Sequence, residues 1–163
     1  MKKILIVMIF AVSGFVNAQA YKGKGDVKFQ IGANFQDGGN GITTSTDFGL
    51  GENMSFGFVT SYLLNTTTIY GTPKFDDRVD VKARFNAHLG NVLNISDKAD
   101  VYPGLDLGLR NFGAHLGARY FFTNGFGVYT EAGFPIAKYK TDSSGYDYLN
   151  NQFVFTIGAS FNL

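Results

Sequence analysis

The chain ends with Gln152-Phe153-Val154-Phe155-Thr156-Ile157-Gly158-Ala159-Ser160-Phe161-Asn162-Leu163. Every second side chain from Phe153 to Leu163 is apolar, and the residues between them are mostly small or polar. Successive side chains of a β-strand point to opposite faces, so this stretch predicts a strand with one apolar and one polar face. Such a strand suits a barrel whose outer side meets lipid and whose inner side lines a polar lumen.

Seven earlier segments alternate in the same way, and each is close to the ~10 residues expected of a membrane barrel strand. They cover residues 26–36, 42–50, 54–64, 79–90, 101–110, 114–120 and 126–136. Adding the C-terminal stretch, we predict an all-β fold: an eight-stranded, antiparallel, up-and-down transmembrane β-barrel.

The predicted connections alternate in length, which orients the barrel. Those expected outside are residues 37–41, 65–77, 110–113 and 138–151, and those expected in the periplasm are 51–53, 94–100 and 123–125. The two longest connections both fall outside, in agreement with the rule of short periplasmic turns and longer external loops.

The N-terminus has the pattern of a secretory signal. Lys2 and Lys3 precede an apolar run over residues 4–12, and Val16-Asn17-Ala18 gives a small-residue cleavage pattern. The apolar run is shorter than the ~20 residues that a membrane-spanning helix needs. We predict a signal peptide over residues 1–18, a barrel domain over residues 19–163, and an integral outer-membrane location after export.

Composition excludes several classes of function. The chain has no cysteine, so disulfides, zinc-thiolate sites, thiol catalysis and lipoprotein processing are ruled out. Loss of residues 1–18 removes Lys2 and Lys3 from the 14 basic residues, which leaves 12 against 13 acidic ones. This near balance argues against nucleic acid as a partner.

The inward positions of the predicted strands gather charged side chains of both signs. Because eight strands leave a space that side chains can fill, these charges must pair. Arg84 and Arg119 are expected near the centre, and Glu131 is expected opposite Arg119 because both lie equally far from the turn at 123–125. The predicted network consists of Lys28, Asp47, Asp80, Lys82, Arg84, Asp106, Arg110, Arg119 and Glu131. We interpret it as a static plug; a gated polar conduit is the alternative.

The outward positions predict a lipid-facing band bordered by aromatic girdles. The band includes Phe29, Ile31, Phe56, Phe58, Val81, Phe85, Leu107, Leu116, Val128, Phe155 and Ile157. The girdles are expected to contain Tyr62, Tyr70, Tyr102, Tyr120, Tyr139, Phe75, Phe121 and Phe122. Candidate contacts for a ligand of the external loops are Tyr70, Phe75, Tyr146 and Tyr148.

Catalytic and metal chemistry have little support in the sequence. The two histidines, His88 and His115, are both inward, and Ser143 and Ser144 lie in the last loop. No serine stands in a Gly-x-Ser-x-Gly motif. The histidines show no metal-ligand spacing. We expect no enzymatic activity, no cofactor and no metal.

Two resemblances agree with this fold. Thr156, Gly158, Phe161 and Leu163 resemble the C-terminal assembly signal of bacterial outer-membrane barrels, with Leu in place of the usual terminal Phe. The whole chain resembles the small eight-stranded outer-membrane barrels of the OmpA/OmpX type. The segments that also resemble an uncharacterised domain-of-unknown-function family of outer-membrane barrels are residues 23–36, 48–57, 80–93, 102–139 and 153–163. These resemblances imply a Gram-negative outer membrane, outer-membrane lipid and the barrel-assembly machinery as partners, and no settled activity.

The sequence therefore predicts a monomeric, non-enzymatic barrel with a structural or surface-interaction role. Its external loops, 65–77 and 138–151, are expected to make any contact with an extracellular ligand. A narrow pore or small-solute conduit is the alternative function, and an outer-membrane lipid-modifying enzyme is the third.

Overall fold

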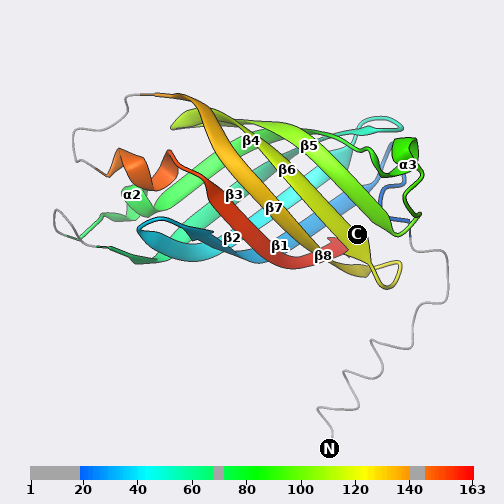
Figure 1. The fold of residues 1–163 in the computed structure, drawn as a ribbon, viewed down its shortest axis with the longest axis horizontal. Helices are drawn as coiled ribbons and strands as arrows, with labels where there is room; N and C mark the ends of the chain where they lie inside the picture. Colours follow the sequence, from blue (N-terminus) through cyan, green and yellow to red (C-terminus); the bar gives the residue numbers. More distant parts are fainter. Residues whose placement is uncertain (1–18, 68–71, 140–145) are drawn as a thin grey trace, which may run out of the picture.

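The computed structural model describes residues 19–67, 72–139 and 146–163, and these form one closed sheet. Each strand is antiparallel to the next in the sequence, and the last strand pairs with the first (Figure 1). The strands are β1 (Val27–Gln36), β2 (Gly39–Gly49), β3 (Met54–Thr66), β4 (Val79–Ala87), β5 (Ala99–Gly108), β6 (Asn111–Phe121), β7 (Phe126–Lys138) and β8 (Val154–Asn162). The prediction of an all-β, eight-stranded antiparallel barrel is confirmed.

Short helices lie at both ends of the barrel. One end, here the α2 end, carries α2 (Phe75–Arg78) and the 3-10 helix η1 (Asp147–Asn150). The other, here the α3 end, carries α3 (Gly90–Leu93), the chain's C-terminus and the approach to β1 (Figure 1). Among the described residues no helix has the length and apolar character needed to cross a membrane.

Several predicted boundaries were wrong by a few residues. The turn predicted at 37–41 is reduced to Asp37-Gly38, where the positive φ of Gly38 (69°) allows a two-residue hairpin connection. The connection predicted at 110–113 lies instead at residues 109–110, and β6 already begins at Asn111. Between the predicted fourth strand (79–90) and the predicted turn (94–100), residues 90–93 form α3, which ends at Asn94 in the left-handed conformation.

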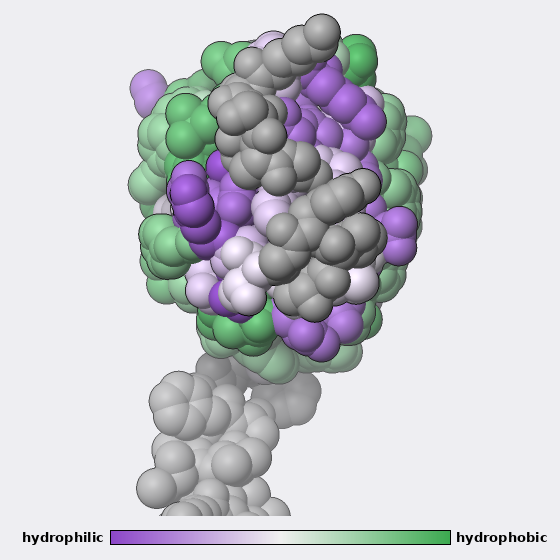
Figure 2. Space-filling model, turned by 90° about the vertical axis from the view of Figure 1, so that its left-hand side faces the viewer, coloured by the Kyte–Doolittle hydropathy of each residue, from purple (hydrophilic) through white to green (hydrophobic). Residues whose placement is uncertain are grey.

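The barrel has an apolar outside and a polar inside. Large apolar side chains on the outer face are exposed, such as Phe58 (51%), Leu107 (61%) and Ile157 (51%). The residues that alternate with them are buried although many are polar, for example Gln30 and Asn86. Seen from the α2 end, polar residues occupy the centre and apolar residues surround them (Figure 2).

Inward glycines make room for large inward side chains. Gly117 pairs with Tyr102 across β5 and β6, and a Cβ at Gly117 would lie 2.2 Å from the Tyr102 ring. Similarly, a Cβ at Gly104 would lie 2.3 Å from His115, and one at Gly57 would lie 2.3 Å from Asp47. Small and large residues thus alternate across neighbouring strands so that the narrow interior is filled without overlap.

The seam that closes the barrel also depends on glycine. Gly32 of β1 pairs with Gly158 of β8. A Cβ at Gly158 would lie 2.1 Å from the carbonyl oxygen of Ile31, and one at Gly32 would lie 2.7 Å from the hydroxyl of Tyr129. A side chain at Gly158 would therefore overlap the backbone of β1, and one at Gly32 would overlap the backbone of β8 and the Tyr129 hydroxyl.

Gly117→Ala should destabilise the barrel, because its methyl group would overlap the ring of Tyr102. We expect a loss of about 1–3 kcal/mol in the free energy of unfolding, the usual cost of overpacking. Urea unfolding of the refolded protein in detergent micelles measures the loss. Gly133→Ala is the matched control, because a Cβ at this inward glycine would meet nothing closer than 3.9 Å. Equal effects of the two substitutions would contradict the packing described here.

Candidate functional site in the barrel interior

Arg84 of β4 is the centre of a buried ionic cluster on the side of the α2 end. Its guanidinium contacts Glu131 of β7 (Nη2 to Oε2, 2.6 Å) and Asp47 of β2 (Nε to Oδ1, 3.5 Å). The side chain of Arg84 is 1% exposed, so both ion pairs are shielded from solvent. The Asp47 contact crosses β3 at Gly57, the residue that lies between Asp47 and Arg84 in the sheet register. The missing side chain at Gly57 leaves this path open.

His115 joins Arg84 to a further carboxylate. Its Nδ1 lies 3.0 Å from Asp106 Oδ2, and its Nε2 lies 2.8 Å from Arg84 Nη2. Asp106 and Arg84 are also direct neighbours in the pairing of β4 with β5. Two residues before Arg84 on β4, Lys82 forms an ion pair with Asp80, and its Nζ lies 3.2 Å from Asp80 Oδ2. The structure thus brings together six of the predicted network residues: Asp47, Asp80, Lys82, Arg84, Asp106 and Glu131.

Arg119 belongs to a second cluster, nearer the α3 end. It contacts Asp100 of β5 (Nη2 to Oδ2, 2.8 Å), its direct cross-strand neighbour. The predicted contact between Arg119 and Glu131 is therefore wrong. The register of β6 with β7 pairs Arg119 with Tyr129 and Gly117 with Glu131, so Glu131 lies two residues further from the hairpin turn. Asp100 was missed because the sequence placed it in a turn, whereas β5 begins at Ala99.

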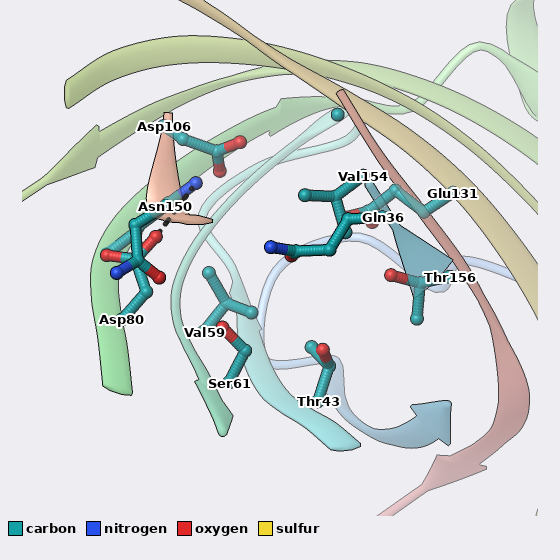
Figure 3. Close-up of a pocket in the computed structure, with 12 residues that line it drawn as sticks. Gln36, Thr43, Val59, Ser61, Asp80, Asp106, Glu131, Asn150, Val154 and Thr156 are labelled. Atoms are coloured by element: carbon teal, nitrogen blue, oxygen red, sulfur yellow. Dashed lines mark ion pairs between the residues drawn. The ribbon is translucent and has the colours of Figure 1, made fainter. Parts of the chain in front are cut away.

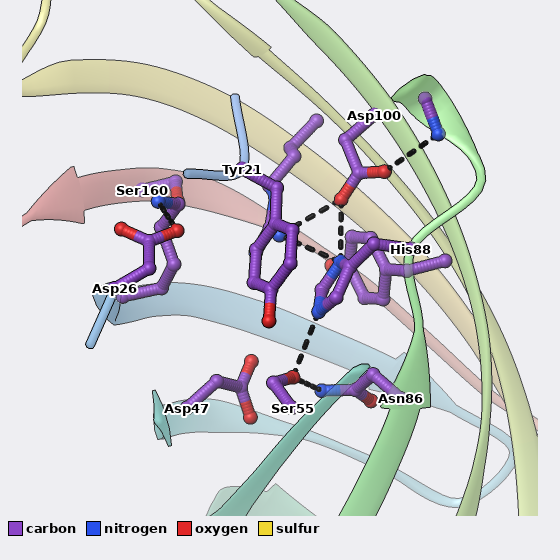
Figure 4. Close-up of polar contacts among 12 residues, drawn as sticks. Tyr21, Asp26, Asp47, Ser55, Asn86, His88, Asp100 and Ser160 are labelled. Atoms are coloured by element: carbon purple, nitrogen blue, oxygen red, sulfur yellow. Dashed lines mark hydrogen bonds and ion pairs between the residues drawn. The ribbon is translucent and has the colours of Figure 1, made fainter. Parts of the chain in front are cut away.

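Asp100 also organises the surroundings of His88 (Figure 4). His88 Nδ1 lies 2.7 Å from Asp100 Oδ2, and the backbone N–H of Gly90 donates to Asp100 Oδ1 at 3.1 Å. On the other side of the ring, His88 Nε2 lies 2.8 Å from the hydroxyl of Ser55. Asp100 accordingly fixes both the ring of His88 and the first turn of α3.

Ser55, His88 and Asp100 have the contact order of a serine-hydrolase triad, which no local sequence motif indicated. However, Ser55 is 0% and His88 1% exposed. The hydroxyl of Ser55 also accepts a hydrogen bond from Asn86 Nδ2 at 3.0 Å. Within the described part of the chain, no open approach to this hydroxyl is left for a substrate carbonyl. The three residues therefore act as a buried hydrogen-bond network that ties β3, β4 and β5 together.

The segment before β1 covers this second cluster from the α3 end. The ring of Tyr21 stacks on His88 at 3.7 Å between ring centroids, and its hydroxyl donates to the carbonyl oxygen of Gly51 at 3.0 Å. Burial, with the neighbouring Asp26 carboxylate, raises the pKa of Tyr21 to about 12, so the hydroxyl stays protonated as a donor. Asp26 in turn pairs with Lys28, the predicted network residue nearest this end. The sequence did not indicate Tyr21, because nothing in its local pattern points into a barrel.

Tyr102 separates the two clusters. It is fully buried, and the guanidinium carbons of Arg119 and Arg84 lie 4.8 and 5.9 Å from its ring centroid. Its prediction as a girdle residue is therefore wrong, as is that of the fully buried Phe121. The sequence did contain a signal for the inward position of Tyr102. Side chains alternate between the two faces of a strand, and Tyr102 lies four residues before Asp106, so both point inward.

Arg110 is not part of the lumen network. It follows the end of β5 at Gly108 and lies in the connection to β6. There its guanidinium contacts Asp147 Oδ1 at 3.5 Å and donates to the carbonyl oxygen of Asp76 at 2.7 Å. It therefore joins η1 to α2 at the end of the barrel.

The α2 end is closed by side chains of η1. Leu149 is fully buried and packs with Leu63 and Tyr146. Asn150 donates to the carbonyl oxygen of Asp77 at 2.8 Å, and Asn111 donates to the carbonyl oxygen of Asn150 at 2.6 Å. These contacts hold η1 against α2 and the start of β6.

This packing corrects the predicted loop contacts. Tyr146 is only 4% exposed, because its ring packs on the barrel end instead of facing outward. Tyr148 is partly buried against the same cluster. Phe75 is 72% exposed and lies 5.6 Å from the ring of Tyr62, next to the outer aromatic residues. Tyr70, together with Ser143, Ser144 and the signal segment 1–18, lies outside the described residues.

The residues that resemble an assembly signal lie on both faces of β8. Thr156 is buried toward the interior, and Gly158 lies at the seam with β1. Phe161 is outward, with ring centroids 6.3 Å from Phe29 and 5.6 Å from Phe126. Leu163 is 79% exposed at the chain end.

Metal coordination by several side chains is not supported. Across residues 19–67, 72–139 and 146–163, no three His, Cys, Asp or Glu side chains are grouped so that they could hold a metal ion.

Comparisons with known proteins agree with the fold. A model of a family of unknown function (DUF6646) matches residues 11–163. A solved structure described as a de novo design of transmembrane β-barrels is similar with a TM-score of 0.59 and 9% sequence identity, over 87% of this chain and 98% of that chain. No curated protein matches the sequence.

The Arg84–Glu131 pair should show strong energetic coupling. Glu131→Ala leaves the Arg84 guanidinium buried without its nearest carboxylate, a loss of about 3–5 kcal/mol. Arg84→Met combined with Glu131→Ala should therefore cost less than the two single losses added. A double-mutant cycle by reversible urea unfolding measures the coupling. The control cycle pairs Arg119→Met with Glu131→Ala; a larger coupling there than at Arg84 would contradict the observed ion pairs.

Proposed function

The chain belongs to the family of unknown function DUF6646, and we propose that it is a monomeric integral outer-membrane β-barrel with a closed lumen and a structural or surface-interaction role. The proposal includes export by a signal peptide over residues 1–18 and no enzymatic activity. Both chain ends then face the periplasm at the α3 end, and the α2 end faces outward.

One observation carries the membrane assignment: large apolar side chains are exposed on every strand, all around the barrel. One residue from each strand, in order from β1 to β8, gives Ile31, Ile42, Phe58, Phe85, Leu107, Leu116, Phe134 and Ile157. An apolar surface that is continuous around a protein would be unfavourable in water but is satisfied by lipid tails. The similar solved structure is described as transmembrane, which supports the same assignment.

The orientation rests on the connections. The two longest ones, residues 67–78 and 139–153, both lie at the α2 end, and the connection 88–98 at the α3 end is slightly shorter than 67–78. External loops of such barrels are longer than periplasmic turns, which supports an outward-facing α2 end. Any surface contact would then be made by these connections, with the exposed ring of Phe75 at their edge.

The closed lumen is supported by the buried side chains that fill it. Leu149 lies at one end and Tyr21 at the other, with Tyr102 between them, and all three are at most 2% exposed. Eight-stranded barrels have interiors that side chains can fill, whereas open aqueous channels belong to larger barrels. A narrow pore remains the alternative, and an outer-membrane lipid-modifying enzyme is the third candidate.

Arginine on the outer band tests the membrane assignment. Phe85→Arg and Ile157→Arg should each cost ~2–4 kcal/mol in lipid vesicles, because the charge would enter hydrocarbon. Leu93→Arg is the control, since Leu93 is similarly exposed (58%) but belongs to α3, outside the strands. Urea unfolding in vesicles measures all three. Wild-type stability of the two strand variants would refute insertion.

Planar-bilayer recording separates a closed barrel from a pore. The pure refolded protein should insert without producing stable single-channel steps, because buried side chains fill its interior. Leu149→Ala, Tyr102→Ala and Tyr21→Ala combined remove large side chains from both ends and from the middle of the lumen, and should raise the frequency of current steps. Stable steps from the wild-type protein would favour the pore.

A further inference from the structure

A cavity of about 60 Å³ lies inside the barrel, between the Arg84–Glu131 ion pair and η1. Its walls include Asp80, Asp106 and Glu131, together with Lys82 (Figure 3). Since a water molecule needs at least ~10–15 Å³ of such volume, the cavity has room for a small ion and a few waters.

Two carboxylate oxygens at this cavity have no hydrogen-bond partner. Asp80 and Asp106 are 6% and 7% exposed, and each uses one oxygen in an ion pair, to Lys82 and His115 respectively. The other oxygen of each, Oδ1, is buried and without a hydrogen bond among the described residues. An unpaired buried carboxylate oxygen is costly, so both positions favour a donor or a cation.

The charge balance of the interior points to a cation. Around the cavity, the carboxylates of Asp80, Asp106 and Glu131 face the two permanent cations Lys82 and Arg84. These groups therefore have one excess negative charge when His115 is neutral.

The cluster on the side of the α3 end is balanced. It places Lys28 and Arg119 against Asp26 and Asp100, two cations against two carboxylates. Asp47 contacts Arg84 and is the strand neighbour of Lys28, so it lies between the two clusters and adds one further negative charge to the lumen.

We propose that the cavity binds one small monovalent cation, an alkali-metal or ammonium ion, between Asp80 and Asp106. A divalent metal is disfavoured because no three ligating carboxylates or histidines are grouped in the described residues. Neutral oxygens of Ser61 and Asn150 also line the cavity and can contribute to a loose shell around a weakly hydrated ion, whereas Thr156 lies on the opposite side (Figure 3).

Rubidium is the direct probe. Equilibrium dialysis of the refolded protein in micelles against radioactive Rb⁺, with choline chloride holding the ionic strength, should show saturable binding of a single ion. Potassium and ammonium should displace Rb⁺, and their relative potency shows which type of ion fits better; choline should not compete because of its size. No saturable Rb⁺ binding by the wild-type protein overturns the proposal whatever the variants do.

Variants locate the site. Asp106→Asn and Asp80→Asn should each abolish Rb⁺ binding, because each removes one of the two carboxylates. Asp37→Asn is the matched control, since Asp37 is an exposed aspartate at the same end of the barrel. If Asp106→Asn retains wild-type binding, or Asp37→Asn loses it, the ion does not bind in the cavity.

A wild-type measurement covers the case in which a lumen variant does not fold. The urea midpoint of the wild-type protein should rise with potassium or ammonium chloride relative to choline chloride at equal ionic strength, because binding stabilises only the folded state. An identical midpoint in all these salts would count against the site. These experiments are done in micelles, so their outcome is separate from that of the vesicle tests of membrane insertion.

Discussion

The ion pair between Arg84 and Glu131 is the contact on which the interior depends. It joins β4 to β7, strands that share no backbone hydrogen bonds, so it acts across the lumen. In so narrow a space each charge must meet its partner, because a buried charge left alone costs several kcal/mol, about 3–5 when one member of a pair is removed. The backbone ladders fix which strands are neighbours and in which register, and that register brings the two side chains into contact across the lumen.

Period-two alternation explains what could be predicted from the sequence. It predicts the eight strands and which side chains of each strand point outward, because a shift of the strand register by one residue would turn the apolar side chains inward. The position of each inward side chain along the barrel axis was harder to predict. The hairpin of β6 and β7 has Glu131 opposite Gly117, not Arg119, and only the strand pairing determines this offset. Tyr102 and Asp100 share the inward parity of Asp106, but their positions near the start of β5 hid this signal.

The two ends of the lumen could not be predicted, for a different reason. Tyr21 stacks on His88, and Leu149 packs on Leu63, so both contacts join residues far apart in the sequence. Neither Tyr21 nor Leu149 belongs to a strand, so period-two reasoning does not apply to them. From the sequence alone, an aromatic or apolar residue in a connection is easily interpreted as an exposed contact for a ligand. Tyr146 was predicted in this way, but it is buried at the end of the barrel.

The two halves of the lumen differ in how an ion would meet them. From the α3 end an ion would have to displace Tyr21, which is stacked on His88 and bonded to the carbonyl oxygen of Gly51, and would then meet a charge-balanced cluster. In the half toward the α2 end, Asp80 and Asp106 present free oxygens to a cavity, and a cation there breaks no existing hydrogen bond. The excess negative charge therefore favours occupancy of one site without favouring passage. A cation bound in this cavity could not continue to the α3 end. The proposed cation site is therefore compatible with a closed barrel.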